Sequence, residues 1–187
     1  IGSYPTVAFS TVKKGAIDEI TPMVVTAKGG FPEPIYTTAW SITTLESDSI
    51  IGTVRSLPEA LSEIPSIMVQ KTALGQSSPY IRGLTGYHNV LLVDGIRLNH
   101  SAMRSGPNQY WSTVELFGSD RVEALRGTHG VLFGADAVGG IVNSLSSEPS
   151  YSNQKNYRSF ELLGRASSAE RSFSAGFSAE VSSPKWF

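Results

Sequence analysis

The chain has 187 residues, of which 40% are hydrophobic and 17% charged, and 15 Lys and Arg against 16 Asp and Glu give a net charge of −1. This apolar content suffices for a buried core and argues against disorder along the whole chain. The balanced charge leaves no electrostatic footprint for nucleic acid. The absence of cysteine excludes disulfides, thiolate metal sites and cysteine nucleophiles.

Residues 1–40 predict an extended, mobile leader that contacts the rest of the chain little. They lack a helical repeat and are interrupted by Pro and Gly. Within them, Met23 to Thr26 is a short β-prone run. The chain begins at Ile1 without a recognisable export signal, so we expect such a signal to have been removed or never included. No apolar run reaches about 18 residues, so no transmembrane helix is expected.

Residues 41–150 predict a small α+β domain with a mixed sheet and short helices. Leu57, Ala60, Leu61 and Ile64 have helical spacing, with Thr53 or Ser56 as the cap and Pro65 as the stop. Short helical turns are also expected within residues 111–117 and 131–133. The expected strands are residues 41–45, 67–70, 80–82, 89–93, 96–98, 122–126 and 141–143.

Turns and loops join these elements. Asp94-Gly95 is a strong signal for a tight turn between two strands. Residues 71–79 and 99–110 are polar and are predicted to be loops.

Residues 151–187 have a different pattern. Apolar Phe173, Ala175, Phe177, Ala179 and Val181 alternate strictly with small or polar residues. Residues 160–166 alternate similarly, except that Leu163 breaks the pattern, and residues 167–170 are the expected turn between the two runs. The alternation is typical of a transmembrane β-hairpin, but also of a half-buried hairpin in a soluble protein.

Several segments follow one another in a specific order along the chain. Together these motifs cover about residues 21–145 and resemble the plug domain of TonB-dependent outer-membrane receptors. The segments are TPMVVTA (21–27), LPEALSEIPSIMVQ (57–70), IRG (81–83), VLLVDGIRLN (90–99), DRVEALRG (120–127) and LFGADAVGGIVN (132–143).

The chain also departs from the family pattern. Thr128 stands where the family usually has Pro, and the strand at Val142 to Ser146 is more polar than usual. Family barrels have about 22 strands, whereas 37 residues follow position 150. The resemblance therefore implies a leader with a TonB box (1–40), a plug domain (41–150) and the first strands of a truncated barrel (151–187), that is, a fragment of a larger receptor.

The resemblance assigns residues 21–27 as a TonB box. In the family this segment is an added strand on the periplasmic domain of TonB, which pairs with its backbone groups. Met23, Val24, Val25 and Thr26 are the expected binding residues, and Pro22 removes one donor at their start. The alternative interpretation is a plain linker.

The resemblance also implies contacts between plug and barrel. In the family, comparable plug charges form buried ion pairs with the barrel wall. The corresponding residues are Arg82, Arg121, Glu123 and Arg126. The alternative is a set of solvated charges on strand faces, and without a barrel we expect these residues to be exposed.

Loops 71–79, 84–88 and 99–110 are expected to face an outside ligand. His88 and His100 could bind iron or haem, or could be loop histidines without the spacing of a metal site. Aromatic Tyr87, Tyr110 and Trp111 are better candidates for ligand contact. We predict no metal site and no cofactor.

The sequence offers no nucleophile with a supporting base and acid, so no catalytic residue and no enzyme is expected. The resemblance implies a receptor in the Gram-negative outer membrane that takes up a nutrient such as a siderophore, haem, cobalamin or a glycan. Its expected partners are the nutrient, TonB and the lipid around the barrel, with no nucleic acid. The alternative is a soluble plug-like binding module without a barrel.

Overall fold

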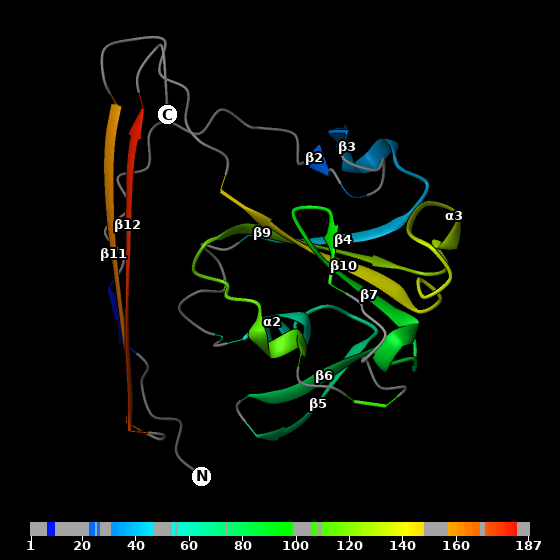
Figure 1. The fold of residues 1–187 in the computed structure, drawn as a ribbon, viewed down its shortest axis with the longest axis horizontal. Coiled ribbons are helices and arrows are strands. Elements are labelled where there is room, and N and C mark those ends of the chain that lie inside the picture. The colour runs from blue at the N-terminus through cyan, green and yellow to red at the C-terminus, as the bar shows by residue number, and fades with distance from the viewer. Residues whose placement is uncertain are drawn as a thin grey trace. The chain divides into compact units, whose positions relative to one another are not determined.

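The structure is a computed structural model that describes residues 7–9, 23–24, 26, 31–46, 54, 56–73, 75–98, 106–107, 110–147, 157–168 and 171–182. Contacts divide the chain into two compact units (Figure 1). The larger unit is Ile20–Ser147, and the smaller unit combines Ile1–Glu19 with Glu148–Phe187. No helix within the described residues is long and apolar enough to cross a membrane.

A mixed five-stranded sheet is the centre of the larger unit, in the order β4-β9-β10-β7-β8 (Figure 1). β7 and β10 pair in parallel and the other neighbours are antiparallel. This sheet and the short helices around it confirm the predicted α+β class. The strands are β4 (Ser41–Glu46), β7 (Asn89–Val93), β8 (Ile96–Arg97), β9 (Ser119–Arg126) and β10 (Gly140–Ser146).

The turn between β7 and β8 is the one that the sequence predicts. Asp94 and Gly95 both have positive φ angles, 50° and 78°. Two such residues form the tight turn whose twist matches that of the flanking strands. The turn sets the register in which Leu92 lies opposite Arg97.

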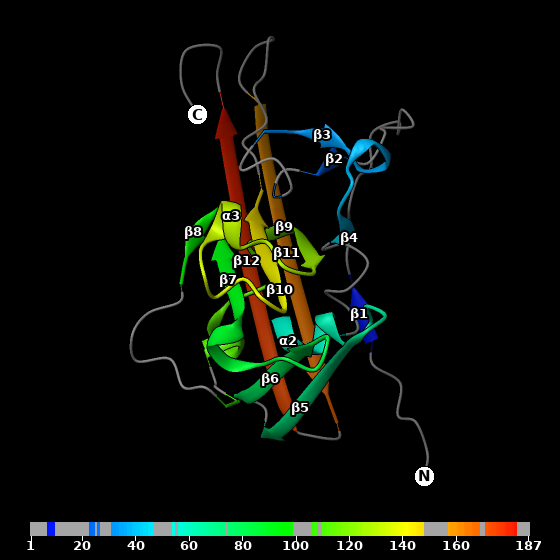
Figure 2. The ribbon, with the colours of Figure 1, turned by 90° about the vertical axis from the view of Figure 1, so that its right-hand side faces the viewer.

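One face of the sheet is covered by α2 (Leu57–Leu61), a hairpin of β5 (Ile67–Ala73) and β6 (Gln76–Ile81), and the 3-10 helix η4 (Tyr110–Thr113) (Figure 2). Ser56 is the N-cap residue of α2, although its side chain makes no capping hydrogen bond. The predicted polar loop at 71–79 is wrong. Both strands continue through it and pair, because antiparallel pairing satisfies their backbone groups almost to the tip.

The other face is covered by parts of the predicted leader and by α3 (Gly130–Phe133). β2 (Met23–Val24) pairs with β3 (Glu33–Pro34), and the 3-10 helix η2 (Ile35–Thr37) follows directly. Val24 and Ile35 pack against the sheet core. For the described part of the leader, the expectation of little contact is therefore wrong, because Val24 and Ile35 belong to this second layer.

Coverage on both faces explains the unbroken apolar run in β7. Val90 and Leu92 belong to the core on the leader side, whereas Leu91 belongs to the core on the α2 side. Successive strand residues point to opposite faces, so a strand buried on both sides is apolar throughout.

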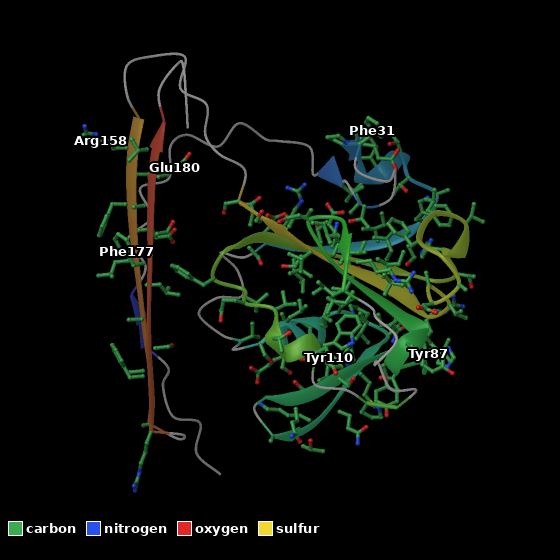
Figure 3. The ribbon with its side chains drawn as sticks, in the orientation of Figure 1. Phe31, Tyr87, Tyr110, Arg158, Phe177 and Glu180 are labelled. Atoms are coloured by element: carbon green, nitrogen blue, oxygen red, sulfur yellow. The ribbon has the colours of Figure 1, made fainter. Side chains whose placement is uncertain are left out.

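The smaller unit contains the predicted hairpin. β11 (Tyr157–Ser167) and β12 (Ser172–Ser182) are antiparallel, and β1 (Val7–Phe9), which the sequence did not predict, pairs with β11. Leu162 lies opposite Phe177, so both side chains share one face. The Phe160 and Phe177 rings meet edge to face at 4.7 Å. Phe177 is nevertheless 60% exposed, which leaves this apolar face uncovered within the unit (Figure 3).

Candidate functional site

The TonB-box-like run lies partly inside the larger unit. Val24 is completely buried in the core on the leader side of the sheet. Thr26 is also buried. The structure describes Met23 by its backbone alone, and Val25 lies outside the described residues. The end of the run is thus docked on the sheet.

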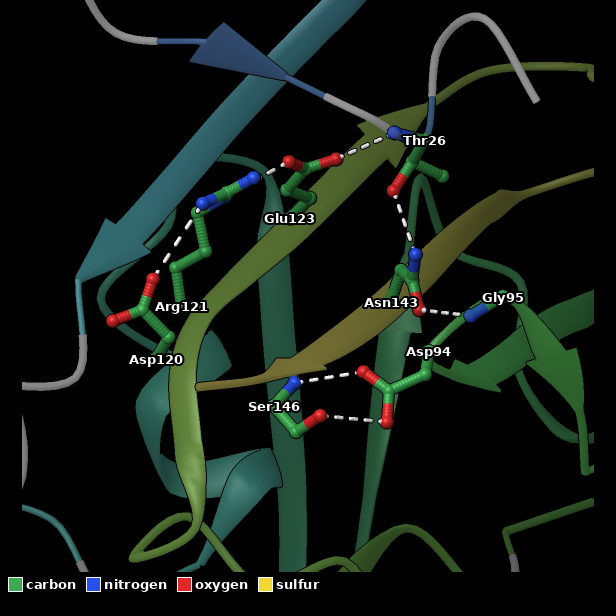
Figure 4. Close-up of polar contacts among 8 residues, drawn as sticks. All are labelled: Thr26, Asp94, Gly95, Asp120, Arg121, Glu123, Asn143 and Ser146. Atoms are coloured by element: carbon green, nitrogen blue, oxygen red, sulfur yellow. Dashed lines mark hydrogen bonds and ion pairs between the residues drawn. The ribbon is translucent and has the colours of Figure 1, made fainter. Parts of the chain in front are cut away.

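Thr26 is bonded to both central antiparallel strands (Figure 4). Its backbone N–H donates to Oε2 of Glu123 on β9 at 2.7 Å. Its hydroxyl accepts a hydrogen bond from Nδ2 of Asn143 on β10 at 2.9 Å. Glu123 and Asn143 are direct register partners, so one leader residue is held by a cross-strand pair.

Glu123 is a fully buried carboxylate inside the larger unit. Its Oε1 accepts a hydrogen bond from Nε of Arg121 at 3.1 Å. The Arg121 side chain is 19% exposed and also lies 3.5 Å from Oδ2 of Asp120. A buried charge is tolerated when it is paired and hydrogen-bonded, and both conditions are met here. The predicted exposure of Glu123 and its assignment to barrel contact are therefore wrong, because its partners lie in its own domain.

The network continues from Asn143 to the β7–β8 turn. Oδ1 of Asn143 accepts the backbone N–H of Gly95 at 3.2 Å. The neighbouring Asp94 carboxylate accepts the N–H of Ser146 at 2.8 Å and its hydroxyl at 2.9 Å. The unusual polarity of β10 thus has a structural role, because Asn143 and Ser146 hold the β7–β8 turn in place by hydrogen bonds.

Two of the predicted barrel-contact arginines lie at different places in the fold. Arg82 is exposed and has a left-handed backbone, with φ of 54°. Arg126 is half-buried and donates to the carbonyl of Pro65 at 2.8 Å and to the Thr43 hydroxyl at 3.1 Å. Contact with a barrel stays a prediction for Arg82, Arg121 and Arg126, although the last two are bonded within the domain.

The residues predicted to touch a ligand do not form one set. Tyr87 is 40% exposed, and its ring centroid lies 4.3 Å from that of His88 (Figure 3). Tyr110 is half-buried at the start of η4, and His100 lies outside the described residues. Trp111 is completely buried in the core on the α2 side. Its predicted ligand contact is wrong, because the helical turn of η4 points the indole inward.

His129 is a buried histidine that no sequence pattern singled out. Its ring packs edge-on against Trp40 with centroids 4.5 Å apart. Burial lowers its pKa below the ordinary value of 6.5, and the Arg126 backbone offsets part of this shift. Within the described residues, neither ring nitrogen makes a well-formed hydrogen bond, so the contact with the Arg126 backbone is a weak one. In the same part of the chain, no cluster of three His, Cys, Asp or Glu is arranged to hold a metal ion.

Comparison with known proteins defines the class to which this fold belongs. Residues 34–141 match the family model described as the TonB-dependent receptor plug domain. The match covers more than half of the chain. The chain therefore belongs to the family of TonB-dependent receptor plug domains, and the predicted resemblance is confirmed.

Similar proteins include two vitamin B12 transporters. The chain is 31% identical over 126 residues to the vitamin B12 transporter BtuB of Photobacterium profundum, which is 66% of this chain and 20% of the transporter. It is also 31% identical over 151 residues to BtuB of Vibrio vulnificus, covering 79% and 24% of the two chains. The chain thus spans about a quarter or less of these curated relatives.

Solved receptor structures share the fold. The outer-membrane ferripyoverdine receptor of Pseudomonas aeruginosa, bound to ferripyoverdine, matches with a TM-score of 0.59 and 20% identity over 92% of this chain and 25% of the receptor. The FpvAI–pyocin S2 complex matches with a TM-score of 0.60 and 21% identity over 85% of this chain and 22% of the other chain.

Proposed function

We propose that this chain is the plug of a receptor that takes up a small nutrient across the Gram-negative outer membrane, driven through TonB. The main support is the attachment of Thr26 to Glu123 and Asn143. A partner that adds a strand to the box-like run and pulls it would apply force directly to β9 and β10. The activity is binding and transport rather than chemistry.

The nutrient is proposed from the class of relatives. Two relatives are named as vitamin B12 transporters, and one structural neighbour is a ferripyoverdine receptor. A cobalamin, a ferric siderophore or haem is therefore the proposed cargo. Tyr87, His88, His100 and Tyr110 are the proposed contacts, and Tyr87 offers exposed aromatic area for them.

The hairpin of β11 and β12 is the proposed start of a barrel wall. Its alternation gives one continuous apolar face with Phe173, Phe177 and Val181, which are all exposed. We propose that this face meets lipid. Of the four residues predicted to contact the barrel, Arg82 is the one that is exposed, and we propose that it meets the inner wall.

A peptide of residues 18–30 tests the link to TonB. We expect it to bind the periplasmic domain of TonB, with at least about tenfold weaker binding for Val25→Pro, since Pro removes a backbone donor from the pairing run. Val25→Thr is the matched control, because it retains both the N–H and the β-branch and should bind like the parent peptide. Calorimetry measures the three affinities. Equal binding of the parent and Val25→Pro peptides would contradict the proposed function.

A further inference from the structure

Arg158 has an unusual position on the β11–β12 hairpin, because it is a charged residue on an otherwise apolar face. It lies opposite Val181 in the register of the two strands, and Phe160 is the next residue of β11 on the same face. Figure 3 shows Arg158 and Phe177 on one side of the hairpin and Glu180 on the other. Of the positions of β11 and β12 that share the apolar face, all of which the structure describes, Arg158 alone carries a charge.

Both the apolar face and its one cation are open to solvent within the smaller unit. Phe160, Phe177 and Val181 are exposed, and so is Arg158. Among the residues that the structure describes, no carboxylate forms an ion pair with the Arg158 guanidinium. The face therefore presents a large apolar surface with an accessible cation at one end.

We propose that Arg158 binds the phosphate group of a phospholipid whose acyl chains contact the apolar side chains beside it. A phospholipid carries an anionic group next to hydrocarbon, which is the order in which Arg158 and Phe160 follow each other along β11. A guanidinium presents paired N–H donors that match the oxygens of a phosphate. This inference rests on the proposed function, because it assumes that the apolar face meets lipid.

The length of the face fits this arrangement. From Arg158 to Ala166 the strand advances about 27 Å, at about 3.4 Å per residue. A tilt of about 40° leaves about 20 Å along the membrane normal, against an apolar band about 25 Å tall in outer-membrane barrels. If Ala166 stands at one edge of this band, Arg158 lies about 5 Å inside the other edge. Long cationic side chains extend from such a depth to the headgroups.

Binding of the full chain to lipid vesicles tests the phosphate site. The vesicles are phosphatidylcholine alone or equal parts of phosphatidylcholine and phosphatidylglycerol, and co-flotation measures the bound fraction. We expect Arg158→Gln to bind the anionic vesicles about fivefold more weakly than the parent chain, which corresponds to one Lys or Arg near an anionic surface. Arg158→Lys keeps the charge and should retain most of the parent's affinity. High salt should remove the difference between Arg158→Gln and the parent, because it screens exposed charges.

Lys71→Gln is the matched control for the loss of charge. Lys71 is also an exposed cation, but it belongs to β5 in the larger unit, so this variant should bind vesicles like the parent chain. Phe177→Ser tests the apolar part of the face separately. It should weaken binding to both kinds of vesicle about tenfold or more, because a large apolar side chain no longer enters the hydrocarbon.

The outcomes distinguish a failure of this inference from a failure of the proposed function. If Phe177→Ser weakens vesicle binding but Arg158→Gln binds no more weakly than Lys71→Gln, the phosphate site is overturned and the proposed lipid-facing hairpin stands. If the parent chain does not bind vesicles, or if Phe177→Ser binds them as the parent does, the lipid-facing hairpin fails and the phosphate site fails with it.

Sedimentation of the chain without vesicles tests whether a second copy covers the same face instead. We expect the parent chain and Phe177→Ser to sediment alike at the concentrations of the vesicle assay. If Phe177→Ser abolishes a self-association of the parent chain and leaves vesicle binding unchanged, the apolar face binds another copy of the chain, and the phosphate site is overturned.

Discussion

Strands of the larger unit and of the β11–β12 hairpin differ in how far their side chains are buried. In β7 and β10, residues of both parities are buried, because other segments cover both faces of the sheet. In β12, the alternation places Phe173, Phe177 and Val181 on one face, and all three are exposed. Alternation thus predicts which side chains share a face, whereas the covering segments decide whether that face is buried.

The two units therefore differ in whether they contain the partners of their own side chains. The larger unit contains its own partners, even for the carboxylate of Glu123. The hairpin has its backbone paired from Tyr157 to Ser182 but leaves large apolar side chains without cover. Large exposed apolar patches often mark interaction sites, and contact of this face with lipid remains our proposal.

Truncation of one apolar side chain in each unit is the strongest test of this contrast. Leu91→Ala creates a cavity in the α2-side core and is expected to lower the free energy of unfolding by about 2–5 kcal/mol. Phe177→Ala removes a side chain that is 60% exposed, so its effect is expected to stay within about 0.5 kcal/mol. Denaturant unfolding followed by tryptophan fluorescence measures both. Similar losses for the two variants would show that the hairpin face is covered in solution.

Removal of one cation from each of two ion pairs extends the contrast from apolar groups to charges. Arg121→Ala removes the guanidinium that is bonded to the buried Glu123 carboxylate, so we expect a loss of roughly 3 kcal/mol. Lys71→Ala breaks the pair with Glu59, whose atoms lie 3.2 Å apart with side chains 40% and 32% exposed. Solvent screens such a pair, and a loss below about 1 kcal/mol is expected. Equal losses in the same unfolding assay would contradict the internal role assigned to Arg121.

Substitutions at two glycines compare a turn whose backbone conformation favours glycine with a turn that accepts other residues. Gly95 has φ of 78°, and Gly95→Ala is expected to lower stability by about 1 kcal/mol, because alanine is strained there. A methyl group at Gly75 would meet no neighbouring atom within 4 Å, and the φ of Gly75 is not left-handed, so Gly75→Ala should change stability by less than about 0.5 kcal/mol. Thermal unfolding measures the pair. A Gly95→Ala protein as stable as Gly75→Ala would mean that the Asp94-Gly95 turn does not set the register of β7 and β8.

The sequence predicted those parts of the fold that depend on local pattern. The residue types at Asp94-Gly95 predicted the tight turn. The alternation at residues 173–181 predicted which side chains of β12 share one face. The β5–β6 tip was mistaken for a loop because its residues are polar, although backbone pairing does not require apolar side chains.

The parts that depend on contacts distant in sequence were not predictable in the same way. Glu123 was expected to be exposed, because its predicted partners were on a barrel wall that the chain is too short to form. Its partner Thr26 lies 97 residues away, in a segment whose Pro and Gly content predicted little contact. Trp111 was assigned to ligand contact from its aromatic character, but its burial depends on α2 and β6, which no local pattern places beside it.

The pH dependence of unfolding gives the smallest expected effect. It can distinguish the two units because they differ in histidine content. All three histidines lie outside β11 and β12, so a histidine-linked change in stability reports on the larger unit. Burial lowers the pKa of His129 below 6.5. The unfolded chain then binds a proton before the folded chain does, so the stability that the neutral ring provides is complete above pH 6.5 and is lost as pH falls toward the folded-state pKa.

The His129→Phe variant isolates this contribution, because phenylalanine keeps an aromatic ring beside Trp40 but does not titrate. Denaturation midpoints measured from about pH 7 to about pH 5 should fall more steeply for the parent chain than for the variant, by an amount that corresponds to at most one proton. The acidic residues titrate in both proteins, so the difference between the two slopes removes their contribution. If the midpoints of the two proteins change equally with pH, the His129 ring is hydrated in the folded state. Water would then reach the surroundings of His129, which the structure shows as buried.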